Sequence, residues 1–426
     1  MDLAALDLDK SLRLYPLTFL EEGDEVTVGR ADIDSYGLFP VDAAALLRRL
    51  EAGDSPNQAA RWFGEEYGEQ VDILEFLEVL DEYEMLVPEG EQVAEAKAVR
   101  WQRLGTALFS PPVWVLYTAL IVAGVAAMLL DRHVTPRYQN IFFTTSSLVA
   151  LTLGNVIGQA PWILLHEGAH AVAGRRLGLN STLRIGRRFY YLVFVTSLDG
   201  LVAVPRRKRY LPMLAGILVD LLVASALTLA AIPLVGDHGA AGLIGRLFLA
   251  MAFGTLMRFA WQFYFFLRTD LYFLATTVLG CNDLQTVARQ TLQNRFWGLL
   301  GRQDKLVDPE TWTPRDRSVA RWYVWLMVAG YTLMTVLLVV AVIPTAIKIT
   351  ELAVHKLVAN PTPLNITDIC VFLVLNFGEL VIAGVLAVRG WRRRTPARGT
   401  AGADGTADAA TEAVIALPAV AEEVSG

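Results

Sequence analysis

The stretch WILLHEGAHAVAGRRLG, residues 162–178, is the most informative part of this sequence. Its first residues close an apolar run that predicts a membrane-spanning helix over 141–165, because about 20 apolar residues cross a bilayer. His166 and His170 follow four residues apart, so they lie on one face of a continuing helix. Glu167 stands between them. Ionisable side chains at membrane depth are costly and usually mark function.

The composition of the 426-residue chain is that of a membrane protein. Apolar residues make up 54% and charged residues 19%, against about 45–50% and about 25% in soluble domains. These values exclude a purely soluble enzyme, a disordered scaffold and a fibrous repeat. We predict a mainly α, polytopic membrane protein with about six transmembrane helices, at 111–130, 141–165, 211–234, 242–267, 322–346 and 367–388.

Two further apolar segments are too short to span comfortably. The segment 189–204 is interrupted by Asp199 and Gly200, which predicts a re-entrant segment or an interfacial hairpin. The segment 271–281 is expected to continue or re-enter beside the fourth span. We assign 111–390 to the membrane-embedded domain, with a cytosolic loop at about 282–321.

The net charge of −6 combines two parts of opposite sign. The first 100 residues contain 24 acids and 8 bases, whereas the rest contains 19 acids and 29 bases. This shift predicts a separate front domain over 1–90, followed by a polar linker at 91–110. Basic residues flank one side of the six predicted spans, which places the chain in the cell membrane with both termini cytosolic. The tail 391–426 is rich in Ala, Gly and Thr and is predicted to be disordered.

The front domain is predicted to be small, α+β and winged-helix-like. Strands at 17–19 and 25–28 flank a polar turn, which indicates a β-hairpin. Three helices are predicted to follow. The first covers 43–50, the second begins after the N-cap candidate Ser55, and the third covers 71–85. The acidity of this domain argues against a nucleic-acid partner, because phosphate binding needs Lys and Arg.

The HEGAH pattern is typical of a zinc site. Two imidazoles at this spacing can reach one Zn²⁺, and Glu167 is placed to take a proton from a water made acidic by the metal. Zinc hydrolases usually add a third protein ligand. The other histidines fall at predicted external ends or loops, so the candidates are carboxylates in or beside apolar segments: Asp199, Asp220 and Asp270. Of these, Asp220 is also a candidate partner for a ligating histidine.

Several motifs in the membrane-embedded part resemble the site-2 protease superfamily, and most closely its bacterial branch of peptide zinc metalloproteases. The resemblance covers roughly 105–390 and rests on HEGAHAVAGRRLG (166–178), PRRKR (205–209), AGILVDLL (215–222), FLRTDLYFLATTVLG (266–280) and TPRDRSVARWYVW (313–325). It implies an intramembrane metalloprotease in which HExxH and a distant Asp bind Zn²⁺.

The position of that distant Asp departs from the family pattern. The family carries a Leu-Asp-Gly element preceded by Asn and Pro. The matching residue here is Asp270, flanked by Thr269 and Leu271, and Gln262 takes the place of the Asn. The resemblance thus implies metal binding by Asp270 and substrate binding by Gln262. A literal Ser-Leu-Asp-Gly at 197–200 leaves Asp199 as the alternative ligand, and we favour Asp270.

The front domain resembles PqqD-like peptide-recognition domains. The resemblance rests on FPVD (39–42), LLRRLEAGDSPNQAARWFGEEYG (46–68) and FLEVLDEYEMLV (76–87). It implies binding of the leader of a ribosomally made precursor peptide, added as a strand at a sheet edge.

Together these features predict a membrane-embedded zinc metalloprotease. Its expected substrate is a membrane-associated peptide or protein, or a leader-bearing precursor peptide. The alternative is a non-catalytic membrane subunit that binds a peptide and assists its export or maturation. A transporter is not supported, since the sequence shows no internal repeat or paired broken helices.

Overall fold

A computed structural model describes residues 6–23, 25–88, 91, 99–142, 147–188, 191–236, 241–359, 361–375 and 378. The predicted tail 391–426, the end of the span 367–388 and part of the linker lie outside the described residues. The chain is mainly helical, with a small N-terminal sheet. Within the described part, five helices are long and apolar enough to cross a membrane: Pro111–Leu130, Leu148–Arg176, Arg206–Leu234, Leu243–Trp261 and Pro314–Val340. The sixth predicted span is represented by a shorter apolar helix, Pro363–Leu375.

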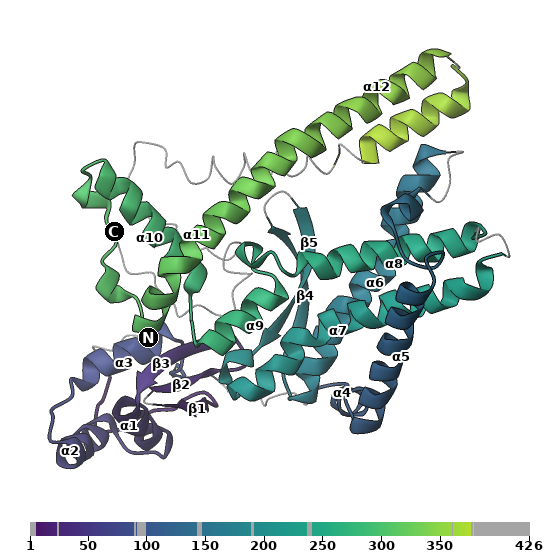
Figure 1. Ribbon diagram of the computed structural model, residues 1–426. Coiled ribbons are helices and arrows are strands. Elements are labelled where there is room, and N and C mark those ends of the chain that lie inside the picture. The colour runs from purple at the N-terminus through teal and green to yellow at the C-terminus, as the bar shows by residue number, and fades with distance from the viewer. Residues whose placement is uncertain are drawn as a thin grey trace.

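The N-terminal domain packs three strands against three helices (Figure 1). Its elements are β1 (Thr18–Glu22), β2 (Glu25–Arg30), β3 (Ser35–Pro40), α1 (Val41–Glu51), α2 (Pro56–Tyr67) and α3 (Ile73–Glu82). The antiparallel sheet has the order β1-β2-β3. Ser55 caps α2 in a capping box with Gln58, as its sequence position predicts.

Strand β3 was missed by the sequence analysis. Its side chains are buried on both faces of the sheet, with Tyr36 and Phe39 each 5% exposed. A strand buried on both faces lacks the polar–apolar alternation by which strands are recognised. Phe39 belongs to the domain's own core with Leu47 and Leu77, whereas Tyr36 lies on the opposite face, its hydroxyl beside Gly200 of the membrane part.

The outer face of this sheet is docked on the membrane part. Strands β1 and β2 contact a 3-10 turn at Leu201–Ala203. Two acidic side chains complete the contact. Glu22 accepts hydrogen bonds from the backbone N–H and Nε of Arg206, at 3.1 and 2.8 Å, and Asp34 accepts one from the Gly200 N–H at 2.6 Å.

Helix α7 (Arg206–Ala231) is the centre of the membrane part. It packs against α5 (Pro111–Leu130), α6 (Leu148–Arg176), α8 (Leu243–Trp261) and the short α9 (Asp270–Leu279). The most apolar 18-residue stretch of α7 and its 3-10 extension (Arg206–Leu234) has 44% of its residues buried. The corresponding stretches of α5 and α6 each have 6% of their residues buried. Apolar side chains that remain exposed on the outer helices suit a lipid environment.

Within the predicted segment 189–204, residues Tyr191–Asp199 form the second strand of a β-hairpin. Strands β4 (Asn180–Arg188) and β5 (Tyr191–Asp199) pair antiparallel over nine residues each, and both lie against α6 (Figure 1). The hairpin therefore begins earlier than predicted. The sequence analysis did not recognise β4, because its arginines and glycine give it low apolar content.

Three other predicted segments contain helical structure that the sequence did not indicate. The linker 91–110 contains helix α4 (Gln102–Leu108), which packs on α6 because Gly105 lets the two backbones approach. The loop 282–321 contains α10 (Leu284–Leu299) and the start of α11 (Pro314–Leu337). The span 322–346 belongs to a longer helical run, in which a π-helical stretch, Leu338–Val342, joins α11 to α12 (Ile343–Ala359).

The contact between Asp34 and Gly200 predicts a pH-dependent stability. Burial raises the pKa of Asp34 to about 6, so docking favours the protonated carboxyl. This contribution is complete below the ordinary pKa of 3.8 and is lost as the pH rises through about 6. We expect the thermal midpoint of the full chain in detergent to fall by a few degrees between pH 5 and pH 7.

Asp34→Asn should remove that fall, because Asn stays neutral, can still accept from Gly200 and tolerates the backbone angle φ of 57° found here. Glu69→Gln, at an exposed position, is the control and should retain the fall. An unchanged pH dependence in Asp34→Asn would contradict this role of the Asp34 carboxyl.

Candidate metal centre

Three side chains that are distant in sequence converge inside the membrane part. His166 and His170 project from α6, and Asp270 is the first residue of α9. The two Nε2 atoms are 3.2 Å apart, and the Asp270 Oδ2 atom lies 3.2 Å from one and 3.3 Å from the other. Within the described residues, this is the group of His, Cys, Asp and Glu side chains that could hold a metal ion.

The size of this triangle fits a tetrahedral ion. Zinc lies about 2.0–2.2 Å from nitrogen and oxygen ligands, and ligands of a tetrahedral ion at those distances are about 3.3–3.6 Å apart. Of the three observed separations, 3.3 Å is at the lower limit of that range and the two of 3.2 Å lie just below it. An ion held by these three side chains would have a fourth position open, as in catalytic zinc sites.

The hydrogen bonds of the imidazoles determine which nitrogen faces the triangle. His170 Nδ1 lies 2.7 Å from the Pro212 carbonyl oxygen, and His166 Nδ1 lies 3.0 Å from Asp220 Oδ2. Both partners are acceptors, so each Nδ1 carries the proton and each Nε2 presents a lone pair. Two lone pairs and a carboxylate oxygen thus point at one another, an arrangement that suits a cation.

Gly216 provides the space beside this triangle. A Cβ atom at Gly216 would lie 2.3 Å from His170 Nε2 and 2.5 Å from His166 Nε2. A residue with a side chain at this position would therefore clash with both imidazole rings. The glycine of the AGILVDLL stretch has a physical role here, which its sequence context alone did not show.

Asp220 is held on its other side by Arg258 of α8. The Nε and Nη2 atoms of Arg258 lie 3.0 and 2.6 Å from Asp220 Oδ1. Asp220 is 1% exposed, so this is a buried ion pair. The sequence analysis proposed Asp220 as a histidine partner but missed Arg258. An arginine inside the predicted span 242–267 was the available signal.

A break between α8 and α9 places Asp270. The backbone N–H of Asp270 donates to Gln262 Oε1 at 3.0 Å, and Thr269 Oγ1 donates to the Gln262 carbonyl at 2.6 Å. Arg268, which directly precedes Thr269, adopts a left-handed backbone conformation with φ 55°. Gln262 is 5% exposed and contacts the start of α9, so its binding of substrate stays a prediction.

Glu167 faces the β4–β5 hairpin. Thr196 of β5 donates from its hydroxyl to Glu167 Oε2 at 2.7 Å and to the Glu167 carbonyl at 3.1 Å. Asp199, the alternative ligand, is the last residue of β5, and the Ser197 hydroxyl donates to its carboxylate at 3.3 Å. The structure thus brings Asp270, and not Asp199, together with the two histidines. Thr196 had no recognisable signal in the sequence.

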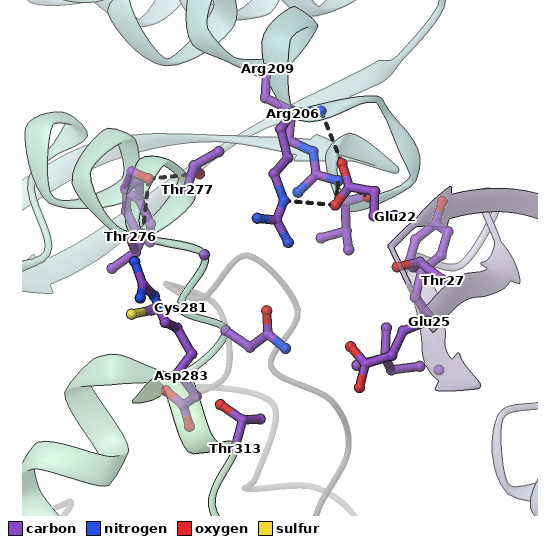
Figure 2. Close-up of a pocket in the computed structure, with 18 of the residues that line it drawn as sticks. Glu22, Glu25, Thr27, Arg206, Arg209, Thr276, Thr277, Cys281, Asp283 and Thr313 are labelled. Carbon is purple, nitrogen blue, oxygen red and sulfur yellow. Dashed lines mark hydrogen bonds and ion pairs between the residues drawn. The ribbon is translucent and has the colours of Figure 1, made fainter. Parts of the chain in front are cut away.

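A separate cavity of about 320 Å³ lies between the N-terminal sheet and the membrane part. Figure 2 shows Glu22, Glu25 and Thr27 on one side and the α9 residues Thr276 and Thr277 on the other. Strand β3 also contributes to its lining, as do four arginines: Arg206, Arg209, Arg268 and Arg315. The cavity therefore adjoins both the sheet and the helix that carries Asp270.

Comparisons with known protein families, with characterised proteins and with solved structures find no match to this chain. The geometry of the site is therefore the basis for assigning a function.

The fit of Gly216 gives a direct test of metal binding at this position. Gly216→Ala should weaken binding of Zn²⁺ by about tenfold or more, because the added methyl group displaces both Nε2 atoms. The measurement is a competition titration of purified protein against a chromogenic chelator. Gly168→Ala, on the neighbouring helix α6 and facing open space, is the matched control and should bind zinc as the wild type does. Equal affinities in the two variants would contradict the assignment.

Proposed function

We propose that this protein is a membrane-embedded zinc metalloprotease of the site-2 protease type. The observation that carries the proposal is the triangle of His166, His170 and Asp270, with its size, its lone pairs and its open fourth position. Zinc bound there supplies a Lewis acid that lowers the pKa of a water molecule to about 7. Asp270 is the third ligand in this proposal.

Glu167 is the general base. It follows His166 directly on α6, and its carboxylate takes the proton of the attacking water and passes it to the leaving amine. Thr196 donates a hydrogen bond to one carboxylate oxygen, which orients the group and leaves the second oxygen for the water. Asp220 and the Pro212 carbonyl hold the Nδ1 protons of the two imidazoles.

The arginine-rich ends of the helices indicate the orientation. Arg175 and Arg176 end α6, and basic residues begin α7 at Arg206. The positive-inside rule places this end at the cytosol. The N-terminal domain, which docks at the same end through Glu22 and Asp34, is then cytosolic as well.

The N-terminal domain is proposed to bind the substrate peptide. Its resemblance to PqqD-like domains suggests strand addition, and β3 is at an edge of the sheet. The lining of the nearby cavity includes Gly37 and Leu38 of β3. A leader-bearing precursor peptide held at β3 would thus lie close to the C-terminal end of β5 at Gly200. Strand β5 also carries Thr196, which contacts Glu167.

Glu167→Gln separates binding from chemistry. The variant should retain about one zinc per chain and lose peptide cleavage, because Gln keeps the shape of the side chain but does not accept a proton. Cleavage is measured with a set of quenched fluorogenic amphipathic peptides in proteoliposomes. His166→Ala, assayed in parallel, should lose both the zinc and the activity.

Two other results of these zinc and cleavage assays would change the proposal. Retained cleavage by Glu167→Gln would remove Glu167 from the mechanism. A wild-type chain that binds peptide without zinc and without cleavage would favour the non-catalytic membrane subunit. The altered residues around Asp270, with Gln262 and Thr269 in place of the family pattern, are what favour that second function.

Peptide binding at β3 can be tested by amide hydrogen exchange of Glu167→Gln. A peptide cleaved by the wild-type chain should slow the exchange of residues 35–40, because strand addition engages free backbone groups. Residues 73–82 of α3, whose amides are already in a helix, are the internal reference. Protection that is absent from residues 35–40 would contradict strand addition at this edge.

A further inference from the structure

A chain of polar side chains crosses the three central helices and ends at His166. Gln159 of α6 accepts from Arg258 Nη1 of α8 at 3.4 Å. Arg258 donates from Nε and Nη2 to Oδ1 of Asp220 on α7. The other carboxylate oxygen, Oδ2, faces His166 Nδ1 at 3.0 Å, again on α6. Each carboxylate oxygen of Asp220 thus has its own partner.

Stability does not account for this buried pair. Replacing a buried ion pair by apolar side chains of similar volume is often neutral or stabilising, because two charges must be removed from water. The cost is higher at membrane depth. The Asp220 side chain is fully buried and that of Arg258 is 18% exposed. A pair in such surroundings is most useful if it controls the orientation of a neighbouring group.

The geometry of Arg258 defines that orientation. Two nitrogens of one planar guanidinium engage a single oxygen, which limits rotation of the Asp220 carboxylate. Arg258 is itself steadied by Gln159, whose amide donates to the Met251 carbonyl at 3.0 Å. Gly254 leaves room for this amide, since a Cβ there would lie 2.1 Å from Gln159 Nε2.

We propose that Arg258 is a positioning residue of the metal centre, which acts through Asp220 to fix the ring orientation and tautomer of His166. The inference rests on the proposed function and deepens it, because it assigns control of one metal ligand to a third helix, α8. The hydrogen bonds that the structure gives for the Arg258 side chain go to Asp220 and Gln159, and the proposed role is exerted through Asp220.

The test compares five variants of the full-length protein in detergent. Asp220→Asn removes the charge, Arg258→Met removes the guanidinium, and Arg258→Lys keeps the charge with one point of contact. The double variant Asp220→Asn/Arg258→Met measures whether the two act together. Arg246→Met, at an exposed position on the same helix, is the control. The readouts are the zinc Kd, from chelator competition, and the visible absorption bands of the Co²⁺-loaded protein.

We expect Asp220→Asn to raise the zinc Kd by about 10–100-fold and Arg258→Met by about tenfold, with altered Co²⁺ bands in both. The zinc Kd of Arg258→Lys should lie between that of Arg258→Met and that of the wild type. The double variant should bind zinc with the same Kd as Asp220→Asn, because Arg258 acts through the Asp220 carboxylate and has no effect once that carboxylate is gone. Arg246→Met should match the wild type.

Two results would overturn the inference alone. One is a wild-type zinc Kd and Co²⁺ spectrum in folded Arg258→Met, even if its thermal midpoint falls, which leaves Arg258 a structural role. The other is a double variant whose loss equals the product of the single losses, which makes the two residues independent. A wild-type chain that binds no zinc overturns the proposed function and this inference with it.

Discussion

The packing of α6 against α7 is the constraint on which the candidate site depends. The Nδ1–H of each imidazole on α6 donates a hydrogen bond to a group on α7, the Pro212 carbonyl or the Asp220 carboxylate. Gly216, between those two residues, has no side chain and so keeps the space beside both Nε2 atoms open. A shift of α7 along α6 by one helical turn, about 5.4 Å, would remove all three features together.

The same helix connects the site to the N-terminal domain. The first residue of α7, Arg206, is bound by Glu22, and the turn that precedes the helix lies under the N-terminal sheet. On the other side, Asp34 binds the Gly200 N–H just beyond β5, and β5 carries Thr196 to Glu167. The domain that is proposed to bind peptide thus contacts the elements on both sides of the site.

Much of this arrangement could be predicted from the sequence, for identifiable reasons. The apolar runs are long, which defined the membrane helices, and the His166–His170 spacing places both rings on one helical face. Asp270 could be selected because its flanking motif resembles a known pattern. Strand β3, the β4 strand and α4 were missed because none has a clear apolar periodicity. Arg258 contacts Asp220, and Thr196 contacts Glu167, only because folding brings these pairs together. An arginine inside an apolar span was a signal for Arg258, whereas the sequence offered none for Thr196.

The proposed third ligand, Asp270, would have a consequence for the metal-free form of the protein. Asp270 and His166 are separated by 104 positions, and Asp270 begins a short helix that follows an irregular, left-handed turn. An ion bound by both residues would cross-link the two ends of this long segment. The free energy of metal binding would then add to the stability of the fold. Removal of the metal would then loosen α9, so a chelating buffer during purification would alter the architecture as well as the proposed reactivity.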